Sequence, residues 1–230
     1  MSSISDLLPG ECRLLVYDLD GTLIDSLPDI RQAVNTVRSN CRVAPHSQET
    51  VRNAIGDGAR VLCSRVLADL IDGDRDAESL FQQFRSAYRD SSMKGDTPRW
   101  YHGARELLRR AGELGIPQAL LTNKPRFITD LLLPRLEVEG PFFRVVCPED
   151  CPAPKPDPGG LLSIVAERGS DRSNTLFIGD SAVDFATGAA AGIVTVGVRG
   201  GYYREVPPQP DIWIPDLEAI LNFINESNPT

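Results

Sequence analysis

The 230-residue sequence lacks any long apolar run. No stretch approaches the roughly 20 apolar residues that a membrane-spanning helix needs, so we expect none. The first residues, MSSISDLLPGECRLL, contain no basic segment followed by an apolar run, so we expect no signal peptide. These absences favour a cytoplasmic protein that does not bind membranes.

Cysteine is scarce, and positive charge is outnumbered by negative charge. The five cysteines form an odd set without C-x-x-C spacing, which predicts reduced thiols rather than a disulfide framework. The 24 basic and 32 acidic residues give a net charge of −8, which repels nucleic acid and anionic membranes. We therefore expect a small molecule as the partner, and local side chains must attract any anionic group on it.

The sequence does contain short apolar runs that alternate with helical patterns. The run at 13–18 ends in polar residues and Gly21, as expected for a buried strand that enters a tight loop. Further strands are predicted at 117–123, 142–148, 174–180, 193–198 and 211–214. Helical patterns of about 10 to 15 residues separate most of them, which predicts an α/β fold with a doubly wound, Rossmann-like parallel sheet. Ligands bind such sheets beyond the carboxyl ends of the strands.

Residues from about 26 to 94 follow a different pattern. Three segments, at 30–40, 59–71 and 77–91, space apolar residues by three and four, which is the helical period. No convincing strand occurs among them. We therefore predict an α/β core domain from residues 1–24 and 97–230, with an all-helical domain at 25–96 inserted after the first strand.

The first predicted strand ends in Asp18-Leu19-Asp20-Gly21-Thr22. A carboxylate at a strand end, such as Asp18, can attack phosphorus and hold a phosphoryl group as a mixed anhydride. A second carboxyl two residues on, Asp20, can act at the leaving oxygen as general acid and then as general base. Gly21 permits a tight turn whose backbone N–H groups can bind phosphate oxygens. The structural alternative is an acidic turn without chemistry.

Three further polar patterns follow the later predicted strands. Thr122 and Asn123 end the second strand, Lys155 lies between prolines that stiffen its loop, and Asp180 follows an apolar strand. Asp184 lies four residues after Asp180, so the two share a helix face if a helix begins there. Taken singly, such residues are common in ordinary loops and first helical turns. Together they place polar groups at the ends of four successive strands.

In this order, the four patterns resemble the four motifs of the haloacid dehalogenase-like superfamily. The resemblance implies an enzyme that acts on a small phosphorylated metabolite, with Asp18 as nucleophile and Asp20 as general acid and base. It also implies that the Thr122 hydroxyl and the N–H of Asn123 bind a phosphate oxygen. Lys155 would neutralise charge on the nucleophile and on the transferred phosphoryl group.

The same resemblance implies Mg²⁺ as the cofactor. Its protein ligands would be the Asp18 side chain, the Asp20 carbonyl and the Asp180 side chain, because a hard divalent cation prefers oxygen ligands. Asp184 would hold a coordinating water or orient Lys155.

Two features indicate which members of the superfamily this sequence resembles. They are the second acid of the first motif and the inserted helices. Dehalogenases of this superfamily lack an acid at the position of Asp20, which therefore favours phosphoryl transfer. The helical insertion has the position and type of a cap that closes over the site and supplies specificity. The segments that most resemble bacterial phosphoglycolate phosphatases are DLDGTLIDS, IGDGARVL, LTNKP, KPDPGGLLSIVAER, FIGDSAVD and GYYREVPPQPDIWIPDL. They imply a hydrolase of 2-phosphoglycolate in carbohydrate metabolism.

The stretch CPEDCPAPKPDP departs from the Gly-Asp-rich approach to the lysine that is more usual in that group. Three alternatives therefore stay open. They are a sugar phosphate phosphatase, for example of N-acetylmuramic acid 6-phosphate, a β-type phosphoglucomutase, and a non-catalytic binding protein on the same scaffold. Asp20 argues against the last, since binding alone does not require it. A monomer and a homodimer are both compatible with the sequence.

The predicted cap offers one candidate for specificity. If Gly56-Asp57-Gly58 forms a turn at a helix N-terminus, its amides face an anion such as a substrate carboxylate. Arg60 could add a charged donor there, although an arginine on a helix surface is a common structural residue. With Thr22 of the first motif, Arg60 completes the predicted substrate-binding residues.

Overall fold

The computed structural model describes residues 4–7, 12–72, 75–94, 99–137, 142–202 and 207–227. The chain divides into two compact units. The α/β unit comprises Met1–Asp25, Arg99–Thr122 and Glu137–Thr230, and the helical unit comprises Ser26–Pro98 and Asn123–Leu136. Residues 123–136 thus group with the helices, although the sequence pattern puts them in the core domain. The domain boundaries themselves stay a prediction.

The α/β unit is built on a six-stranded sheet in which all paired strands are parallel. The strand order is β5-β4-β1-β6-β7-β8. The strands are β1 (Leu14–Tyr17), β4 (Gln118–Leu121), β5 (Arg144–Val146), β6 (Thr175–Gly179), β7 (Val194–Val198) and β8 (Ile212–Ile214). Each lies within one predicted run, and the predicted α/β fold with a parallel sheet is confirmed.

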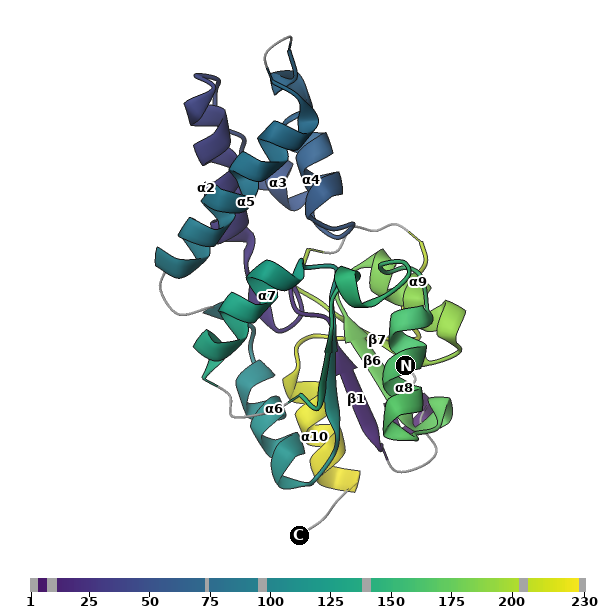
Figure 1. The fold of residues 1–230 in the computed structure, drawn as a ribbon. Helices are drawn as coiled ribbons and strands as arrows, with labels where there is room; N and C mark the ends of the chain where they lie inside the picture. The colour runs from purple at the N-terminus through teal and green to yellow at the C-terminus, as the bar shows by residue number, and fades with distance from the viewer. Residues whose placement is uncertain are drawn as a thin grey trace. The chain divides into compact units, whose positions relative to one another are not determined.

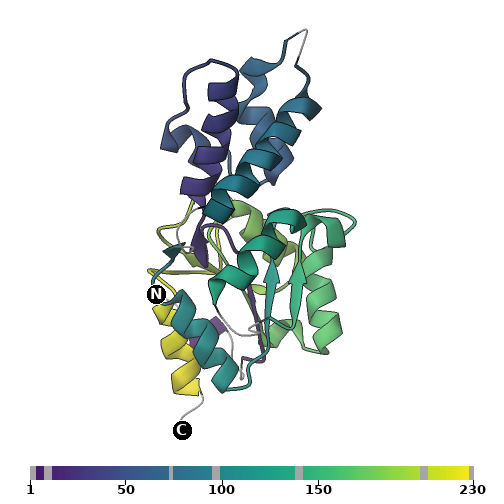
Figure 2. The same cartoon turned by 60° about the vertical axis from the view of Figure 1, so that its left-hand side comes forward.

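Helices cover both faces of this sheet, and a short helix α1 (Ile4–Leu7) precedes it. On one face α6 (Ala104–Glu113) and α10 (Glu218–Ser227) lie side by side, and α8 (Gly159–Arg168) and α9 (Ala182–Ala191) lie on the other (Figures 1 and 2). Because both faces are covered, β1, β4 and β6 are buried along their whole length. One large core cluster contains Leu14, Val16, Leu121, Leu161, Ile164 and Phe177.

A two-stranded ribbon lies where the chain leaves and re-enters the α/β unit. Here β2 (Ile24–Asp25) pairs antiparallel with β3 (Arg99–Trp100). The N–H of Tyr101 donates to the carbonyl of Leu23 at 3.0 Å and extends the pairing. The sequence does not predict this ribbon, because two-residue strands are too short to show an alternating pattern.

The helical unit contains α2 (Leu27–Asn40), α3 (Gln48–Arg52), α4 (Ala59–Val66), α5 (Ala77–Lys94) and α7 (Arg126–Leu132). Within 26–72 and 75–94 the described residues form no strand, in agreement with the predicted helical insertion. Helices α2 and α5 pack along each other (Figure 1). The short α3 was not predicted, because five residues are too few to show a helical period.

One buried arginine connects the loops of the helical unit. Arg38, near the end of α2, is 5% exposed. Its guanidinium donates to the carbonyls of Ala44 and Val66 at 2.7 and 3.1 Å. It also donates to both carboxylate oxygens of Asp69, at 2.8 and 2.9 Å. These hydrogen bonds and the ion pair with Asp69 offset the cost of taking the guanidinium out of water.

Two further features concern the whole described chain. Among the residues that the structure describes, no helix combines the length and the apolar character needed to cross a membrane. None of the five cysteines, all of which lie in the described ranges, forms a disulfide.

Candidate active site

Polar residues follow three neighbouring strands in the middle of the sheet. Asp18 comes directly after β1, Thr122 after β4 and Asp180 after β6. These strands are adjacent and parallel, so their carboxyl ends meet at one edge. All three side chains are buried. The structure thus gathers three of the predicted residues at the edge where α/β sheets bind ligands.

Lys155 reaches this edge from the loop between β5 and α8. Its Nζ lies 2.7 Å from Oδ1 of Asp18 and 2.6 Å from Oδ1 of Asp184. Burial lowers the pKa of Lys155, but the two carboxylates raise it by more, so the pKa lies above its ordinary value. Lys155 is therefore a buried cation directed at Asp18, not a solvated surface lysine.

Asp184 holds that lysine from the first turn of α9. The helix begins at Ala182, so Asp180 precedes it, and the condition for a shared helix face is not met. Asp184 instead forms a capping box, in which its Oδ2 accepts hydrogen bonds from the N–H and the hydroxyl of Ser181 at 3.0 and 2.6 Å. Because the cap occupies Oδ2, Oδ1 is directed to Lys155.

Asp180 is held by two donors from other loops. The Thr22 hydroxyl donates to Oδ1 at 3.0 Å, and the backbone N–H of Tyr202 donates to Oδ2 at 2.6 Å. The sequence predicts that Thr22 binds substrate, but its side chain is fully buried and its hydroxyl is directed to Asp180. Thr22 therefore orients a carboxylate in this structure.

At two glycines the backbone approaches the Asp180 carboxylate closely. Gly21 has a φ of 91°, and a Cβ at this position would lie 2.3 Å from Oδ2 of Asp180. A Cβ at Gly201 would lie 2.5 Å from the same oxygen and 2.3 Å from the carbonyl oxygen of Gly21. No side chain fits at such distances, so glycine is required at both positions. Gly201 and Tyr202 are not among the predicted site residues, because a backbone contact leaves no periodic signal in a sequence.

Three carboxylates lie close together at this edge, and those of Asp18 and Asp184 contact the Lys155 ammonium. Asp18, Asp180 and Asp184 each place one oxygen within 4.8 Å of the others. Burial raises the pKa of Asp18 to about 6, with Lys155 opposing the rise and Asp184 adding to it. Burial, and then the charges of Asp184 and Asp18, raise the pKa of Asp180 well above its usual range. Full ionisation of the cluster would therefore create an excess of negative charge, which a bound cation would relieve.

Asp18 presents one oxygen with incomplete bonding. Its Oδ1 is buried and has no hydrogen-bond partner among the described residues, although Lys155 lies 2.7 Å away. The short distance makes an ion pair. Lone pairs of Asp18 are therefore available to a ligand. Asp20 is half-buried in the turn that follows β1, two residues further along the chain.

Two of the predicted residues, Asn123 and Arg60, lie in the helical unit. The side-chain amide of Asn123 donates to the carbonyl of Gly56 at 3.0 Å. Arg60 is exposed on α4, where its guanidinium pairs with Glu78 at 2.8 Å and lies 4.1 Å from the centre of the Phe81 ring. Both residues thus have partners within their own unit.

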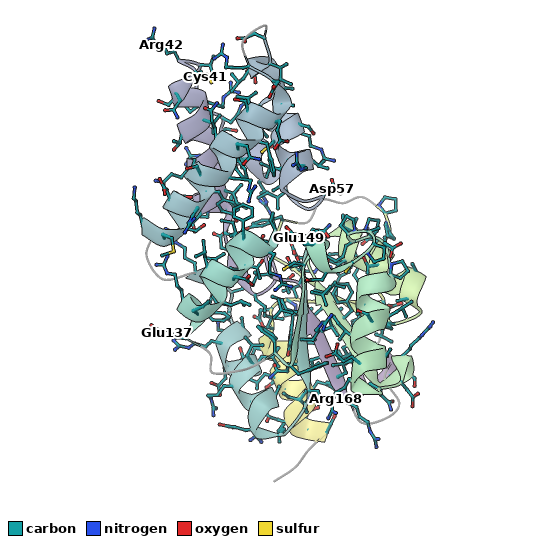
Figure 3. The ribbon with its side chains drawn as sticks, in the orientation of Figure 1. Cys41, Arg42, Asp57, Glu137, Glu149 and Arg168 are labelled. Atoms are coloured by element: carbon teal, nitrogen blue, oxygen red, sulfur yellow. The ribbon has the colours of Figure 1, made fainter. Side chains whose placement is uncertain are left out.

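The chain bends at residues 56 and 57, directly before the N-terminus of α4. Gly58 is the N-cap residue of α4. Asp57, labelled in Figure 3, pairs with Arg65 of the same helix at 2.6 Å. The negative charge of Asp57 weakens the attraction of this loop for an anion, and Arg65 offsets part of that charge.

Comparison with known proteins relates this site to an enzyme family. Residues 15–198 match the family model described as haloacid dehalogenase-like hydrolase. A phosphoglycolate phosphatase of Pseudomonas putida is 38% identical to this chain, over 96% of the chain and 83% of its own length. One of Pseudomonas fluorescens is 35% identical over the same shares.

A solved structure shares the fold. The crystal structure of a predicted phosphoglycolate phosphatase from Haemophilus somnus is 27% identical and superimposes with a TM-score of 0.84. The match covers 92% of this chain and 97% of the other. Since the family model spans most of the sequence and both Pseudomonas relatives exceed 30% identity, this chain belongs to the haloacid dehalogenase-like hydrolase family.

Proposed function

We propose that this chain is a magnesium-dependent phosphomonoester hydrolase that cleaves 2-phosphoglycolate through an aspartyl-phosphate on Asp18. The observation that carries the proposal is the buried group at the carboxyl edge of the sheet, where Lys155 touches Asp18 and three aspartates converge. The relatives named phosphoglycolate phosphatase support the choice of substrate.

The donor set fits Mg²⁺, which takes hard oxygen ligands. Asp18 and Asp180 would hold the ion with their carboxylates, and the carbonyl of Asp20 would be a third protein ligand. The proximity of the Asp18, Asp180 and Asp184 carboxylates and the raised pKa values of Asp18 and Asp180 support a cation at this position. When bound, the ion supplies positive charge that keeps these carboxylates ionised and offsets the charge of the phosphate oxygens.

In the first step Asp18 is the nucleophile. One of its oxygens forms a bond to phosphorus, and the bond between phosphorus and the leaving oxygen breaks. Asp20 donates its proton to that oxygen, so the alcohol leaves neutral. Lys155 offsets the charge that remains, since Asp184 holds its ammonium next to Asp18.

In the second step the intermediate is hydrolysed. Asp20, now a carboxylate, takes a proton from water, and the water oxygen attacks phosphorus. The bond between phosphorus and Asp18 breaks, which releases inorganic phosphate and restores the nucleophile. The Thr122 hydroxyl and the N–H of Asn123 would bind a phosphate oxygen in both steps, and Thr22 would keep Asp180 oriented.

The helical unit would act as the cap that selects the leaving group. The loop at 56–58 and Arg60 are the candidates for binding the carboxylate of 2-phosphoglycolate. The ion pair of Arg60 with Glu78 uses Nη1, so other N–H groups of the guanidinium can donate to a substrate carboxylate. A cap contact of this kind adds binding energy from a part of the substrate that does not react.

A substrate panel tests the proposal. The purified protein would be assayed with 2-phosphoglycolate, N-acetylmuramic acid 6-phosphate, β-glucose 1-phosphate and p-nitrophenyl phosphate. We expect the highest kcat/KM for 2-phosphoglycolate, with activity lost in EDTA and restored by Mg²⁺. Preference for a sugar phosphate would change the substrate and leave the chemistry intact. Conversion of β-glucose 1-phosphate only with a bisphosphate primer would identify a mutase, and no turnover at all would contradict the proposal.

A further inference from the structure

Tyr202 makes two contacts with different parts of the α/β unit. Its backbone N–H donates to Oδ2 of Asp180 at 2.6 Å, and its hydroxyl donates to Oδ1 of Asp25 at 3.0 Å. The residue is 7% exposed, so both contacts are largely sheltered from water. Both acceptors are carboxylates, and hydrogen bonds to charged acceptors are among the stronger ones in proteins.

Asp25 is the last residue of the α/β unit before the helical unit begins. It ends β2 and lies opposite Arg99 of β3. The turn that leads to it starts at Asp18 and is closed by a hydrogen bond of 2.9 Å from the N–H of Gly21 to the carbonyl of Ile24. The segment 18–25 thus carries the proposed nucleophile at one end and the anchor for Tyr202 at the other.

The loop that carries Tyr202 has no space to move toward the site. Gly201 lies so close to Gly21 and Asp180 that a methyl group would not fit between them. This close packing blocks movement of the Tyr202 N–H toward Asp180, so what remains to be prevented is movement away from it. In this structure the other end of Tyr202 is held by Asp25.

We infer that Tyr202 is a positioning residue for the metal-binding carboxylate of Asp180. The hydroxyl anchors the residue on Asp25, and the anchor fixes the N–H that holds Oδ2. With Oδ1 held by Thr22, the carboxylate is oriented before a cation arrives, which is how groups outside the ligand shell raise metal affinity. The inference rests on the proposed function, in which Asp180 binds Mg²⁺.

The first test uses Tyr202→Phe, which removes the hydroxyl and keeps the ring and the N–H. Mg²⁺ would be titrated calorimetrically into the protein without substrate, and the Mg²⁺ dependence of phosphate release would be measured in parallel. We expect the Kd for Mg²⁺ to rise about threefold to tenfold, as for other losses of groups that orient a ligand. At saturating Mg²⁺ we expect kcat to change by less than about twofold.

Substitutions of Asp25 test whether weaker Mg²⁺ binding comes from losing the Tyr202–Asp25 hydrogen bond or from a general loss of stability. Asp25→Asn keeps an acceptor for the hydroxyl, so we expect a Kd near the wild-type value. Asp25→Ala should resemble Tyr202→Phe. The double variant should bind Mg²⁺ no more weakly than either single variant, because both substitutions remove the same hydrogen bond.

Thr175→Val is the control for stability. It removes a buried hydroxyl that donates to the Asp171 carbonyl at 2.9 Å at the start of β6. It should lower thermal stability without changing the Kd.

The outcomes distinguish this inference from the proposed function. A folded Tyr202→Phe protein with wild-type Mg²⁺ affinity would overturn the inference alone, as would additive losses in the double variant. A wild-type protein that hydrolyses phosphate esters without binding Mg²⁺ would overturn both the inference and the metal part of the proposed function.

Discussion

The two units bury charge in opposite ways. In the helical unit the guanidinium of Arg38 is matched by Asp69 and two carbonyls. In the α/β unit three aspartates lie close together, and Lys155 contacts two of them, Asp18 and Asp184. Burial with mutual repulsion raises the pKa of Asp18 to about 6. A buried charge with matched partners is tolerated within a fold, whereas unmatched charge costs stability and is retained where a ligand completes it. The difference supports the proposal that the α/β edge is functional, and it favours a structural role for the Arg38 contacts.

The largest effect should follow from Asp18→Asn. The variant removes the proposed nucleophile, so we expect the rate of phosphate release to fall by at least about a thousandfold. The fold should persist, and the melting temperature without metal should not fall, because one of three repelling carboxylates is gone. Steady-state kinetics and thermal unfolding check both points. A variant that keeps about a tenth of the wild-type rate at saturating Mg²⁺ would rule out the mechanism.

Removing a proposed metal ligand should have the next largest effect. Asp180→Ala should raise the Mg²⁺ concentration for half-maximal activity by at least about tenfold. EDTA should abolish wild-type activity, Mg²⁺ should restore it, and Ca²⁺ should not, because its larger and looser coordination disturbs the attack geometry. The measurement is a titration of activity with each metal after stripping. Full activity of the metal-free enzyme would show that the aspartate cluster at the α/β edge does not serve to bind a metal.

In the helical unit, Arg38→Met should affect stability rather than chemistry. The variant leaves two carbonyls and Asp69 without their donor, so we expect the free energy of unfolding to fall by about 2 to 4 kcal/mol. Its kcat for p-nitrophenyl phosphate at a permissive temperature should stay within about twofold of the wild type. Urea denaturation and kinetics on the same preparation check this, and a selective loss of kcat would make Arg38 functional.

The same variant has a predicted pH dependence. The hydrogen bond from Arg38 holds the pKa of Asp69 below its ordinary value of 3.8. A lowered pKa in the folded state contributes stability that is present above the ordinary value and is lost as pH falls through the lowered one. The stability difference between wild type and Arg38→Met should therefore shrink below about pH 4, and a difference that grows on acidification would contradict the pairing.

The smallest effect is expected at Arg60, which is exposed and already paired with Glu78. Arg60→Ala should lower kcat/KM for 2-phosphoglycolate by roughly tenfold, the effect of losing one charged donor to the substrate carboxylate. Hydrolysis of p-nitrophenyl phosphate, which has no carboxylate, should stay nearly unchanged. Glu78→Gln is the matched control, because it frees Arg60 without removing it. Equal losses on both substrates would make Arg60 structural.

The sequence predicts the parts of this molecule that depend on repeated patterns. Alternating apolar runs and helices predict the parallel sheet, and Asp18, Thr122 and Asp180 could be placed because each directly follows such a run. Parallel strands bring their carboxyl ends to one edge, so separation in the sequence does not matter. Lys155 was predictable only through its motif, since its loop has no periodicity of its own.

The contacts that the sequence does not predict involve backbone groups or single side chains. The β2–β3 ribbon is too short for a pattern, and the N–H of Tyr202 on Asp180 depends on where two loops meet. The hydroxyl of Thr22 is directed to Asp180, although its place in the motif suggested a substrate contact. The sequence does not distinguish Arg38 from the other arginines, because its burial is seen only in the folded chain.

The most direct test of Asp18 as nucleophile is capture of the covalent intermediate. Wild-type protein would be mixed with 2-phosphoglycolate and Mg²⁺, quenched, treated with borohydride, which converts an aspartyl phosphate to homoserine, and analysed by peptide mass spectrometry. We predict homoserine at position 18 in the wild type and none in the Asp18→Asn protein. Reduction at a different aspartate, or equal reduction in both proteins, would contradict the assignment of Asp18.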